Sequence, residues 1–177
     1  MADAAGGEVT LTALAAELGV RTPSLYNHVA GQEGLRRELK LLGLLELRDC
    51  ITRAAVGKAA DDALMAVADA YREFARRRLG IYSLTQQSPD PDDVETMAVA
   101  AETVELLSAI MESYELDGQA SVHAIRGLRS LLHGFAALEA NGGFGMPVDV
   151  DESFRCAVQT FIRGLRDCEC GTERHGR

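Results

Sequence analysis

Apolar residues between positions 10 and 29 recur at a spacing that predicts two short helices joined by a tight turn. The first helix has apolar residues at i, i+3, i+4 and i+7, which lie on one helical face. Thr10 precedes this face and can accept a hydrogen bond from an unpaired backbone N–H, as an N-cap does. Gly19 follows the face, where a residue in the left-handed conformation commonly ends a helix. The apolar residues of the face are Leu11, Leu14, Ala15 and Leu18.

The second helix is predicted to have Thr22 as its N-cap and Pro23 as its first residue, where the missing N–H of proline costs nothing. The helix buries Leu25 and Val29 and leaves small, polar or aromatic side chains on its other faces. Such side chains suit base edges and phosphates in a major groove that admits one helix. The pattern therefore predicts a helix-turn-helix whose second helix reads DNA. A plain helical hairpin is the alternative.

The rest of the chain shows helical periodicity and no useful run of alternating polar and apolar residues. The segment 80–91 interrupts this periodicity and is expected to be a break. The predicted fold is therefore all-α, with roughly eight helices. The longer predicted helices span residues 32–58, 60–79, 92–114, 121–141 and 152–167.

The charge distribution separates the helix-turn-helix from the rest of the chain. The 177 residues carry a net charge of −9, whereas residues 10–40 carry +1, so the remainder is acidic. An acidic body disfavours indiscriminate DNA binding. The small number of basic residues near the second helix predicts a shallow dependence of DNA affinity on salt.

The cysteines and the absence of catalytic motifs exclude several classes of protein. Four cysteines lack the spacing of a secreted disulfide framework, and no signal peptide or membrane-spanning apolar run is present, so a reducing cytoplasm is expected. Cys168 and Cys170 with His175 lack the spacing and the fourth ligand of a zinc site. No nucleophile elbow or phosphate-binding glycine loop occurs. We therefore expect no enzymatic activity, no metal, no cofactor and no membrane partner.

Residues 14–35, LAAELGVRTPSLYNHVAGQEGL, resemble the DNA-binding motif of the TetR/AcrR family of bacterial repressors. The run PSLYNHV, residues 23–29, is especially similar to the tetracycline repressors. The resemblance implies a helix-turn-helix domain at 1–48 and a helical ligand-binding and dimerisation domain at 49–177. The matching positions are Ala15, Gly19, Val20, Leu25, Tyr26, Val29, Glu33 and Leu35.

Two other stretches bear on this resemblance. In the family a further helix precedes the two described above, and here only residues 1–5 can supply its last turn, so that first helix is expected to be largely missing. Residues 131–154, LLHGFAALEANGGFGMPVDVDESF, resemble the C-terminal domain of a TetR subgroup named for a Trp-His-Gly motif. His133 and Gly134 are kept, and Leu132 stands where tryptophan is typical.

The resemblance assigns DNA contacts to the second helix and its flanks. Tyr26 and His28 are expected to hold phosphates, which fixes the register of the helix on the duplex. The short side chains that precede them approach base edges, and Lys40 adds a phosphate contact. A solvated helix face is the alternative for the whole set. It comprises Arg21, Thr22, Pro23, Ser24, Tyr26, Asn27, His28 and Lys40.

An effector pocket is implied by the family. Methionine side chains adapt to apolar ligands, but methionines and aromatic residues at helical spacing also form ordinary cores. His133 lies on an otherwise apolar helix, where it is either a core histidine bonded to a backbone carbonyl or a polar anchor for the ligand. The candidates are Phe74, Tyr82, Met97, Met111, His133 and Phe135.

The last two helices are expected to form a homodimer interface. Gly127 and Gly134 on one helix, with Ala157 and Gly164 on the other, allow close approach, and four such helices make a two-fold bundle. The alternative is that these faces pack within one chain.

Together these features predict a ligand-responsive, dimeric, DNA-binding transcriptional regulator. It is expected to act as a repressor that a small-molecule effector releases from pseudo-palindromic operator DNA. Two reading helices would dock in successive major-groove turns, about 34–36 Å apart. The alternative is an all-helical dimeric protein that binds a small molecule without binding DNA.

Overall fold

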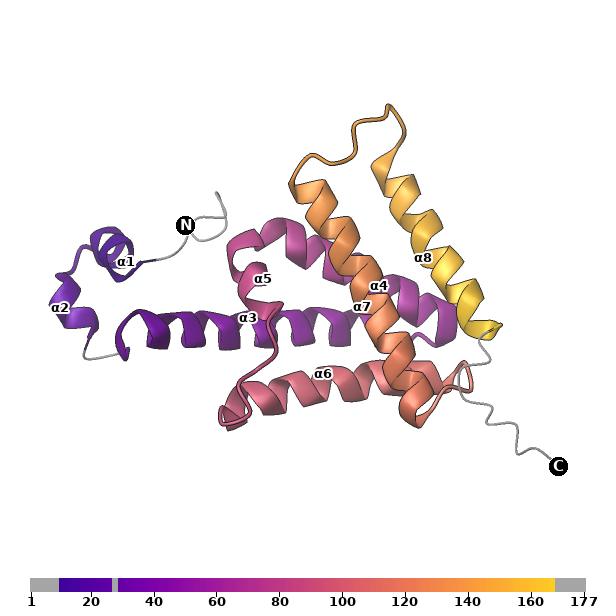
Figure 1. Ribbon diagram of the computed structural model, residues 1–177, viewed down its shortest axis with the longest axis horizontal. Coiled ribbons are helices and arrows are strands. Elements are labelled where there is room, and N and C mark those ends of the chain that lie inside the picture. The colour runs from indigo at the N-terminus through magenta and orange to yellow at the C-terminus, as the bar shows by residue number, and fades with distance from the viewer. Residues whose placement is uncertain (1–9, 27–28, 168–177) are drawn as a thin grey trace. The chain divides into compact units, whose positions relative to one another are not determined.

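A computed structural model of the chain describes residues 10–26 and 29–167, which form eight α-helices and no strand (Figure 1). The all-α prediction is confirmed. The helices are α1 (Leu11–Leu18), α2 (Thr22–Leu25), α3 (Gly31–Ala55), α4 (Ala60–Arg77), α5 (Leu79–Thr85), α6 (Val94–Glu112), α7 (Gly118–Ala140) and α8 (Val150–Arg166).

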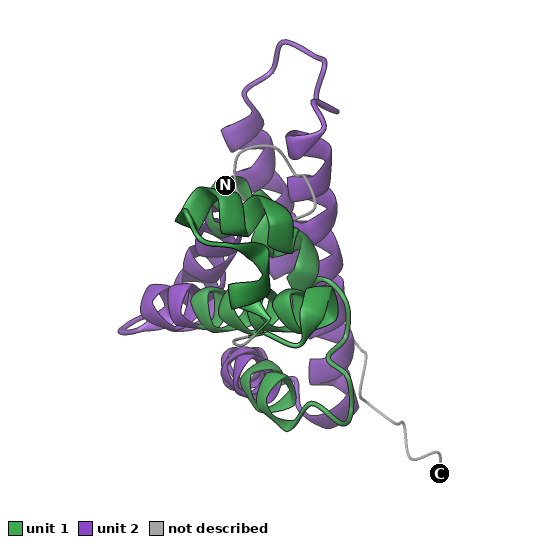
Figure 2. Ribbon diagram, turned by 90° about the vertical axis from the view of Figure 1, so that its left-hand side faces the viewer, with its two compact units in different colours: residues 1–48, 74–100 green, residues 49–73, 101–177 purple. Residues whose placement is uncertain are grey.

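The chain divides into two compact units, which are described separately below (Figure 2). Unit 1 comprises Met1–Arg48 and Phe74–Ala100, and unit 2 comprises Asp49–Glu73 and Ala101–Arg177. Each of α3, α4 and α6 contributes residues to both units. The five longer predicted helices are all present, and their ends differ from the predicted ends by at most three residues.

The caps of the first two helices were predicted partly correctly. The Thr10 hydroxyl accepts the backbone N–H of Ala13 (3.2 Å), and Gly19 ends α1 with φ of +65°, as expected. The prediction of Thr22 as the cap of α2 was wrong by one residue. Arg21 has the extended backbone, and its carbonyl accepts the N–H of Ser24 (2.9 Å), so the helix begins at Thr22.

The predicted break at 80–91 was wrong in its first half, because residues 79–85 form α5. Gly80 and Ser83 lower the helix propensity of this stretch. One face of α5 nevertheless lies in the core, because Ile81, Tyr82 and Thr85 are buried. The Tyr82 N–H also donates to the carbonyl of Arg78 (2.7 Å), which connects the new helix to the end of α4.

Two apolar clusters on different faces of α3 hold unit 1 together. The first cluster packs α1 and α2 against the first turns of α3 through Leu25 and Leu35. The second packs α3 against α6 through Leu44 and Val99. The buried members of the first are Leu11, Ala15, Leu25 and Leu35, with Leu14, Val29 and Leu39 packed against them. The second comprises Leu41, Leu44 and Val99, with Leu45 packed against them.

A third face of α3 meets α5 at Gly43. A Cβ on Gly43 would lie 2.5 Å from Cγ2 of Ile81 and 2.7 Å from Cγ2 of Thr85. Real Cβ atoms do not approach carbon atoms so closely, so α5 packs here because position 43 has no side chain. Arg78 and Glu46 form a paired hydrogen bond nearby, with both nitrogen–oxygen distances at 2.9 Å.

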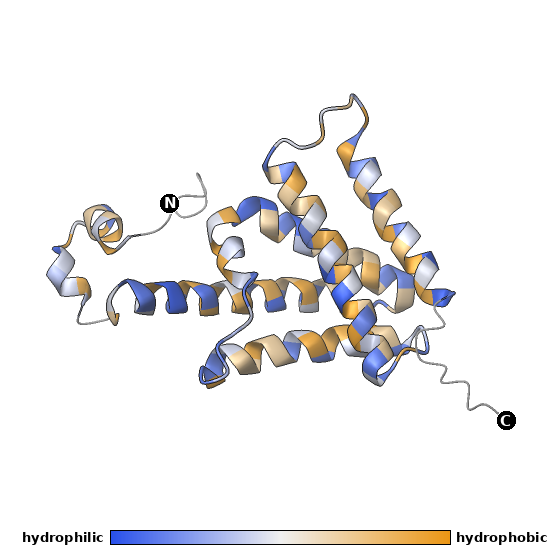
Figure 3. Cartoon of the chain, in the orientation of Figure 1, coloured by the Kyte–Doolittle hydropathy of each residue, from blue (hydrophilic) through white to orange (hydrophobic). Residues whose placement is uncertain are grey.

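Unit 2 buries the apolar face of α8, whose other face is polar (Figure 3). The carboxylate of Asp149 accepts the backbone N–H groups of Asp151 (2.8 Å) and Glu152 (3.0 Å) and so caps this helix. These two bonds lower the pKa of Asp149 below its usual value of 3.8. The buried residues of α8 are Phe154, Val158, Ile162 and Leu165.

Arg72 of α4 is a buried cation that ties α7 to α8 within unit 2. Its guanidinium donates to both carboxylate oxygens of Glu139 (2.9 and 2.6 Å) and to Asp151 (2.8 Å). The same group lies 5.3 Å from the ring centroid of Phe135 and 4.8 Å from that of Phe154. The Arg72 side chain is only 9 % exposed, so its charge depends on these partners for compensation.

Replacing Arg72 with methionine is expected to lower the free energy of unfolding by about 3 kcal/mol, because the two carboxylates lose the cation that compensates them. The double variant Arg72→Met, Glu139→Leu should recover part of this loss. Urea denaturation followed by circular dichroism measures both values. A double variant that is no more stable than the single one would contradict the role given to the ion pair.

Candidate nucleic-acid interface

The short helix α2 presents an exposed face with Leu25 buried behind it. Tyr26, directly after the helix, is 60 % exposed, whereas Thr22 is half-buried. Two predicted contact residues, Asn27 and His28, lie outside the described residues. The exposed members of the predicted set on this face are Arg21, Pro23, Ser24 and Tyr26.

The position of α2 is fixed by its connection to α3. Gly31 begins α3 with φ of +68°, a conformation that glycine adopts without strain. Its N–H donates to the carbonyl of Val29 (2.8 Å), and the side chain of Gln32 accepts the N–H of Leu11 (3.2 Å). The bond to Gln32 connects the starts of α1 and α3 and complements the apolar cluster around Leu25. The exposed face of α2 is therefore carried by the first turns of α3.

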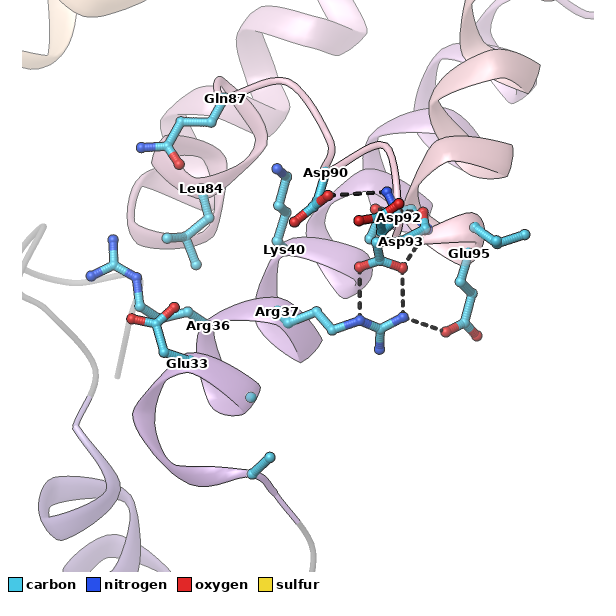
Figure 4. Close-up of a pocket in the computed structure, with 14 residues that line it drawn as sticks. Glu33, Arg36, Arg37, Lys40, Leu84, Gln87, Asp90, Asp92, Asp93 and Glu95 are labelled. Atoms are coloured by element: carbon cyan, nitrogen blue, oxygen red, sulfur yellow. Dashed lines mark hydrogen bonds and ion pairs between the residues drawn. The ribbon is translucent and has the colours of Figure 1, made fainter.

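Lys40 lies on α3 and points toward the segment that connects α5 to α6 (Figure 4). Its ammonium group donates to the backbone carbonyl of Ser88 (2.8 Å). The structure thus gives Lys40 a partner within unit 1. The predicted phosphate contact from this residue stays a prediction.

Arg37, one turn before Lys40, has the densest set of ion pairs described in unit 1 (Figure 4). Its Nε and Nη2 donate to the two carboxylate oxygens of Asp93, each at 2.7 Å. Nη2 also donates to Glu95 (2.9 Å), and Nη1 donates to Glu38 (2.8 Å). Asp93 in turn accepts the backbone N–H of Thr96 (3.3 Å), as an N-cap of α6 does.

The pKa values of this pair reflect their contacts. The hydrogen bonds from Arg37, with that from the Thr96 N–H, lower the pKa of Asp93 from 3.8 to about 2. The bonds to Asp93 and Glu95 raise the pKa of Arg37 above its usual value. Both groups are therefore charged at neutral pH. They line an open cavity of about 770 Å³, whose wall on α3 is basic and whose opposite wall is acidic.

Sequence reasoning missed the role of Arg37. The acidic residues at 92 and 93 do mark a helix start, as the pattern predicts. However, 56 positions separate Arg37 from Asp93, and no local pattern links them.

The six predicted effector-binding residues are divided between the two units. Phe74 and Tyr82 are buried in unit 1 with their ring centroids 6.4 Å apart, whereas Met97 is 43 % exposed. In unit 2, Met111 is fully buried, and His133 and Phe135 are half-buried. Phe135 packs against Phe144 and Phe154, with centroids 4.7 and 5.0 Å away. The assignment of these residues to a pocket stays a prediction.

The described residues also answer two broader questions. Within them, no group of three or more His, Cys, Asp or Glu side chains is placed to hold a metal ion. None of the helices they form is long and apolar enough to cross a membrane. The cysteine pair at 168 and 170, with His175, lies outside the described residues.

Comparison with known proteins links the fold to a family of regulators. A family model described as the tetracyclin repressor-like C-terminal domain matches residues 64–161. The chain is 36 % identical to the HTH-type transcriptional regulator YobS of Bacillus subtilis (strain 168) over 158 residues. This match covers 89 % of this chain and 82 % of that protein. It is 35 % identical over 158 residues to the HTH-type transcriptional regulator Rv0681 of Mycobacterium tuberculosis (strain ATCC 25618 / H37Rv), covering 89 % and 72 %. The fold is similar to that of the TetR family transcriptional regulator PfmR from Thermus thermophilus, with a TM-score of 0.66 and 21 % identity over 88 % of this chain and 85 % of that one.

Replacing Arg37 with glutamine is expected to raise the pKa of Asp93 from about 2 toward its usual 3.8. Because the pKa of Asp93 is depressed in the folded chain, the pair stabilises the fold fully above about pH 4, and this contribution is lost as the pH falls toward 2. A carboxyl-carbon NMR titration measures the pKa. Asp149, which is capped by backbone N–H groups, should titrate unchanged. An unchanged pKa of Asp93 would show that Arg37 does not cause the depression.

Proposed function

This chain belongs to the TetR-like family of transcriptional regulators, and on that premise we propose that it binds operator DNA as a homodimer and leaves it when a small molecule binds. Bound to an operator, such a dimer blocks transcription, so the chain acts as a repressor. The proposal has three parts, namely the DNA-reading face, the dimer and the effector, and each depends on different residues.

The exposed face of α2 is the single observation that carries the DNA-binding proposal. A helix of four residues has little stability of its own, and only Leu25 of α2 is buried. Thr22 is half-buried, Pro23 and Ser24 are exposed, and the exposed Tyr26 follows the helix. A hydroxyl and a phenol in this position can donate to phosphates and approach base edges. The other predicted contacts, from Arg21, Thr22, Asn27, His28 and Lys40, are proposed from the sequence pattern alone.

The dimer is proposed to form through α7 and α8, as the spacing of small residues suggests. Apart from the adjoining residues and backbone of the same helix, no described atom lies within 4 Å of the place where a Cβ on Gly134 or Gly164 would lie, so both positions leave room for a second chain. Gly127 is different, because a Cβ there would lie 3.1 Å from the ring of Phe161 in the same chain. One of the four small residues therefore serves packing within the chain. The other three, which include Ala157, remain candidates for the interface.

The effector is proposed to bind among the six aromatic, methionine and histidine residues predicted for it. Linkage requires that a ligand which weakens operator binding is itself bound more weakly, by the same factor, when operator is present. A small molecule with equal affinity for both states would not regulate the protein.

The DNA-binding proposal is tested with Tyr26, which is 60 % exposed and does not belong to the buried core. Tyr26→Phe removes only the hydroxyl and is expected to weaken binding about tenfold with an unchanged salt slope, because a neutral phenol releases no counterion. Tyr26→Ala should weaken binding further. Fluorescence anisotropy at two salt concentrations, with a duplex from upstream of the gene for this chain, measures affinity and slope.

Two results would contradict this assignment. Wild-type affinity in Tyr26→Ala would show that α2 does not read DNA. A wild-type chain that forms a stable dimer and binds no DNA would favour the alternative, a helical protein that binds a small molecule only.

The dimer is tested by filling the space beside Gly134. Gly134→Leu is expected to weaken the dimer at least tenfold without loss of helix, because within one chain no described atom occupies that space. Ala140→Leu, which adds a leucine on another exposed face of α7, is the matched control. Sedimentation equilibrium measures the dissociation constant. Equal dimer stability in both variants would place the interface elsewhere.

A further inference from the structure

We propose that Arg37 and Lys40 are positioning residues that hold the segment 88–95, here called the strap, against α3, and so keep the end of α3 that carries α2 in the pose that operator DNA selects. The proposal rests on the proposed function, because a pose matters only if α2 reads DNA. It gives Arg37 a role other than contact with phosphates, and it gives Lys40 a second role beside the proposed phosphate contact.

The strap crosses one side of α3 between α5 and α6, and both of these helices also pack on α3 (Figure 1). Before the strap, α5 meets α3 at Gly43. After it, Val99 of α6 joins the apolar cluster with Leu41 and Leu44. Among the described residues, none of the strap belongs to the apolar clusters of α3 given above, and polar residues dominate the strap (Figure 3). Polar bonds must therefore hold the middle of the segment.

Arg37 and Lys40 supply those bonds one turn apart. Lys40 donates to the Ser88 carbonyl at the start of the strap, at 2.8 Å. Arg37 donates to Asp93 and Glu95 at its end, with all three nitrogen–oxygen distances between 2.7 and 2.9 Å. A planar guanidinium that binds a carboxylate through two parallel hydrogen bonds fixes direction as well as distance. The two cations thus hold the strap at two points.

The same turns of α3 carry the DNA-reading part of unit 1. Leu35 belongs to the cluster that buries Leu25, and Leu39 packs against that cluster. Arg37 lies between these leucines in sequence and projects from another face of the helix (Figure 4). One short stretch of α3 therefore contacts α2 through its apolar side chains and the strap through its cations. A change in how the strap holds this stretch also changes where α2 points.

Removing the charge of Asp93 separates two roles for Arg37, contact with DNA phosphates and positioning of α3, because the two roles predict opposite changes in DNA affinity. If Arg37 served DNA phosphates, Asp93 would compete with them, and Asp93→Asn would strengthen DNA binding. If Arg37 positions α3 through Asp93, the same substitution weakens DNA binding. Asparagine is as good an N-cap as aspartate, so the start of α6 is retained in this variant. Asp92→Asn is the matched control, since Asp92 instead donates its backbone N–H to the carboxylate of Asp90 (3.0 Å).

The experiment compares Arg37→Gln, Asp93→Asn, their double variant and Asp92→Asn in the full chain. The probe is the same duplex from upstream of the gene, at two salt concentrations. We expect Arg37→Gln and Asp93→Asn each to weaken binding about five- to tenfold with an unchanged salt slope. The double variant should be no weaker than either single variant, because both remove the same interaction. Asp92→Asn should bind as the wild type does.

Two outcomes would overturn the positioning role. One is stronger binding by Asp93→Asn. The other is a salt slope that falls by about 0.9 in Arg37→Gln while Asp93→Asn binds normally, which is the behaviour of a phosphate contact.

If the wild-type chain binds no DNA, the proposed function fails. Hydrogen exchange then tests separately whether Arg37 and Asp93 hold the strap against α3. Faster exchange of the amides of residues 94–97 in Arg37→Gln and Asp93→Asn, but not in Asp92→Asn, supports it. Equal exchange in all three variants overturns it.

Discussion

The packing of α3 is the constraint on which unit 1 depends, because this helix has to satisfy three neighbours at once. Apolar side chains on one face bury α1 and α2, those on a second face meet α6, and a glycine on a third admits α5. A helix used in this way cannot have a single apolar stripe, since each neighbour requires its own. The polar residues of α3 are therefore confined to the helix surface that these three neighbours leave uncovered, and Arg37 lies on that surface.

Both units use an arginine between carboxylates, at different depths. Arg72 is desolvated, sits over two phenylalanine rings and has Glu139 as a paired acceptor. The Arg37 side chain is 39 % exposed; its partners Glu38 and Glu95 are more than half exposed, whereas Asp93 is 13 % exposed. Ionic strength screens exposed pairs far more than buried ones. The pair in unit 1 is therefore more sensitive to salt than the pair in unit 2.

The local parts of the fold could be predicted from sequence, and the non-local parts could not. Thr10, Gly19 and the apolar spacing of α1 act over a few residues, so their pattern was sufficient to predict the first helix and its turn. The exposed residues of α2 could also be predicted, because burial of Leu25 fixes which side chains of this short helix face away from the core. By contrast, α5 forms because of burial by distant residues, although Gly80 and Ser83 disfavour a helix. The partners of Arg37 and Lys40 lie 56 and 48 residues away, and only the fold brings them together.

The contact between Gly43 and α5 has a mechanical consequence. Most helix contacts contain side chains that can change rotamer, and such contacts absorb small displacements before passing them on. At Gly43 the backbone of α3 meets Ile81 and Thr85 with no side chain of its own to adjust. Both of these side chains are β-branched, and their χ1 angles are stiff. The contact therefore cannot absorb a displacement by side-chain rearrangement, so a shift of α5 toward α3 has to move α3 as a rigid body.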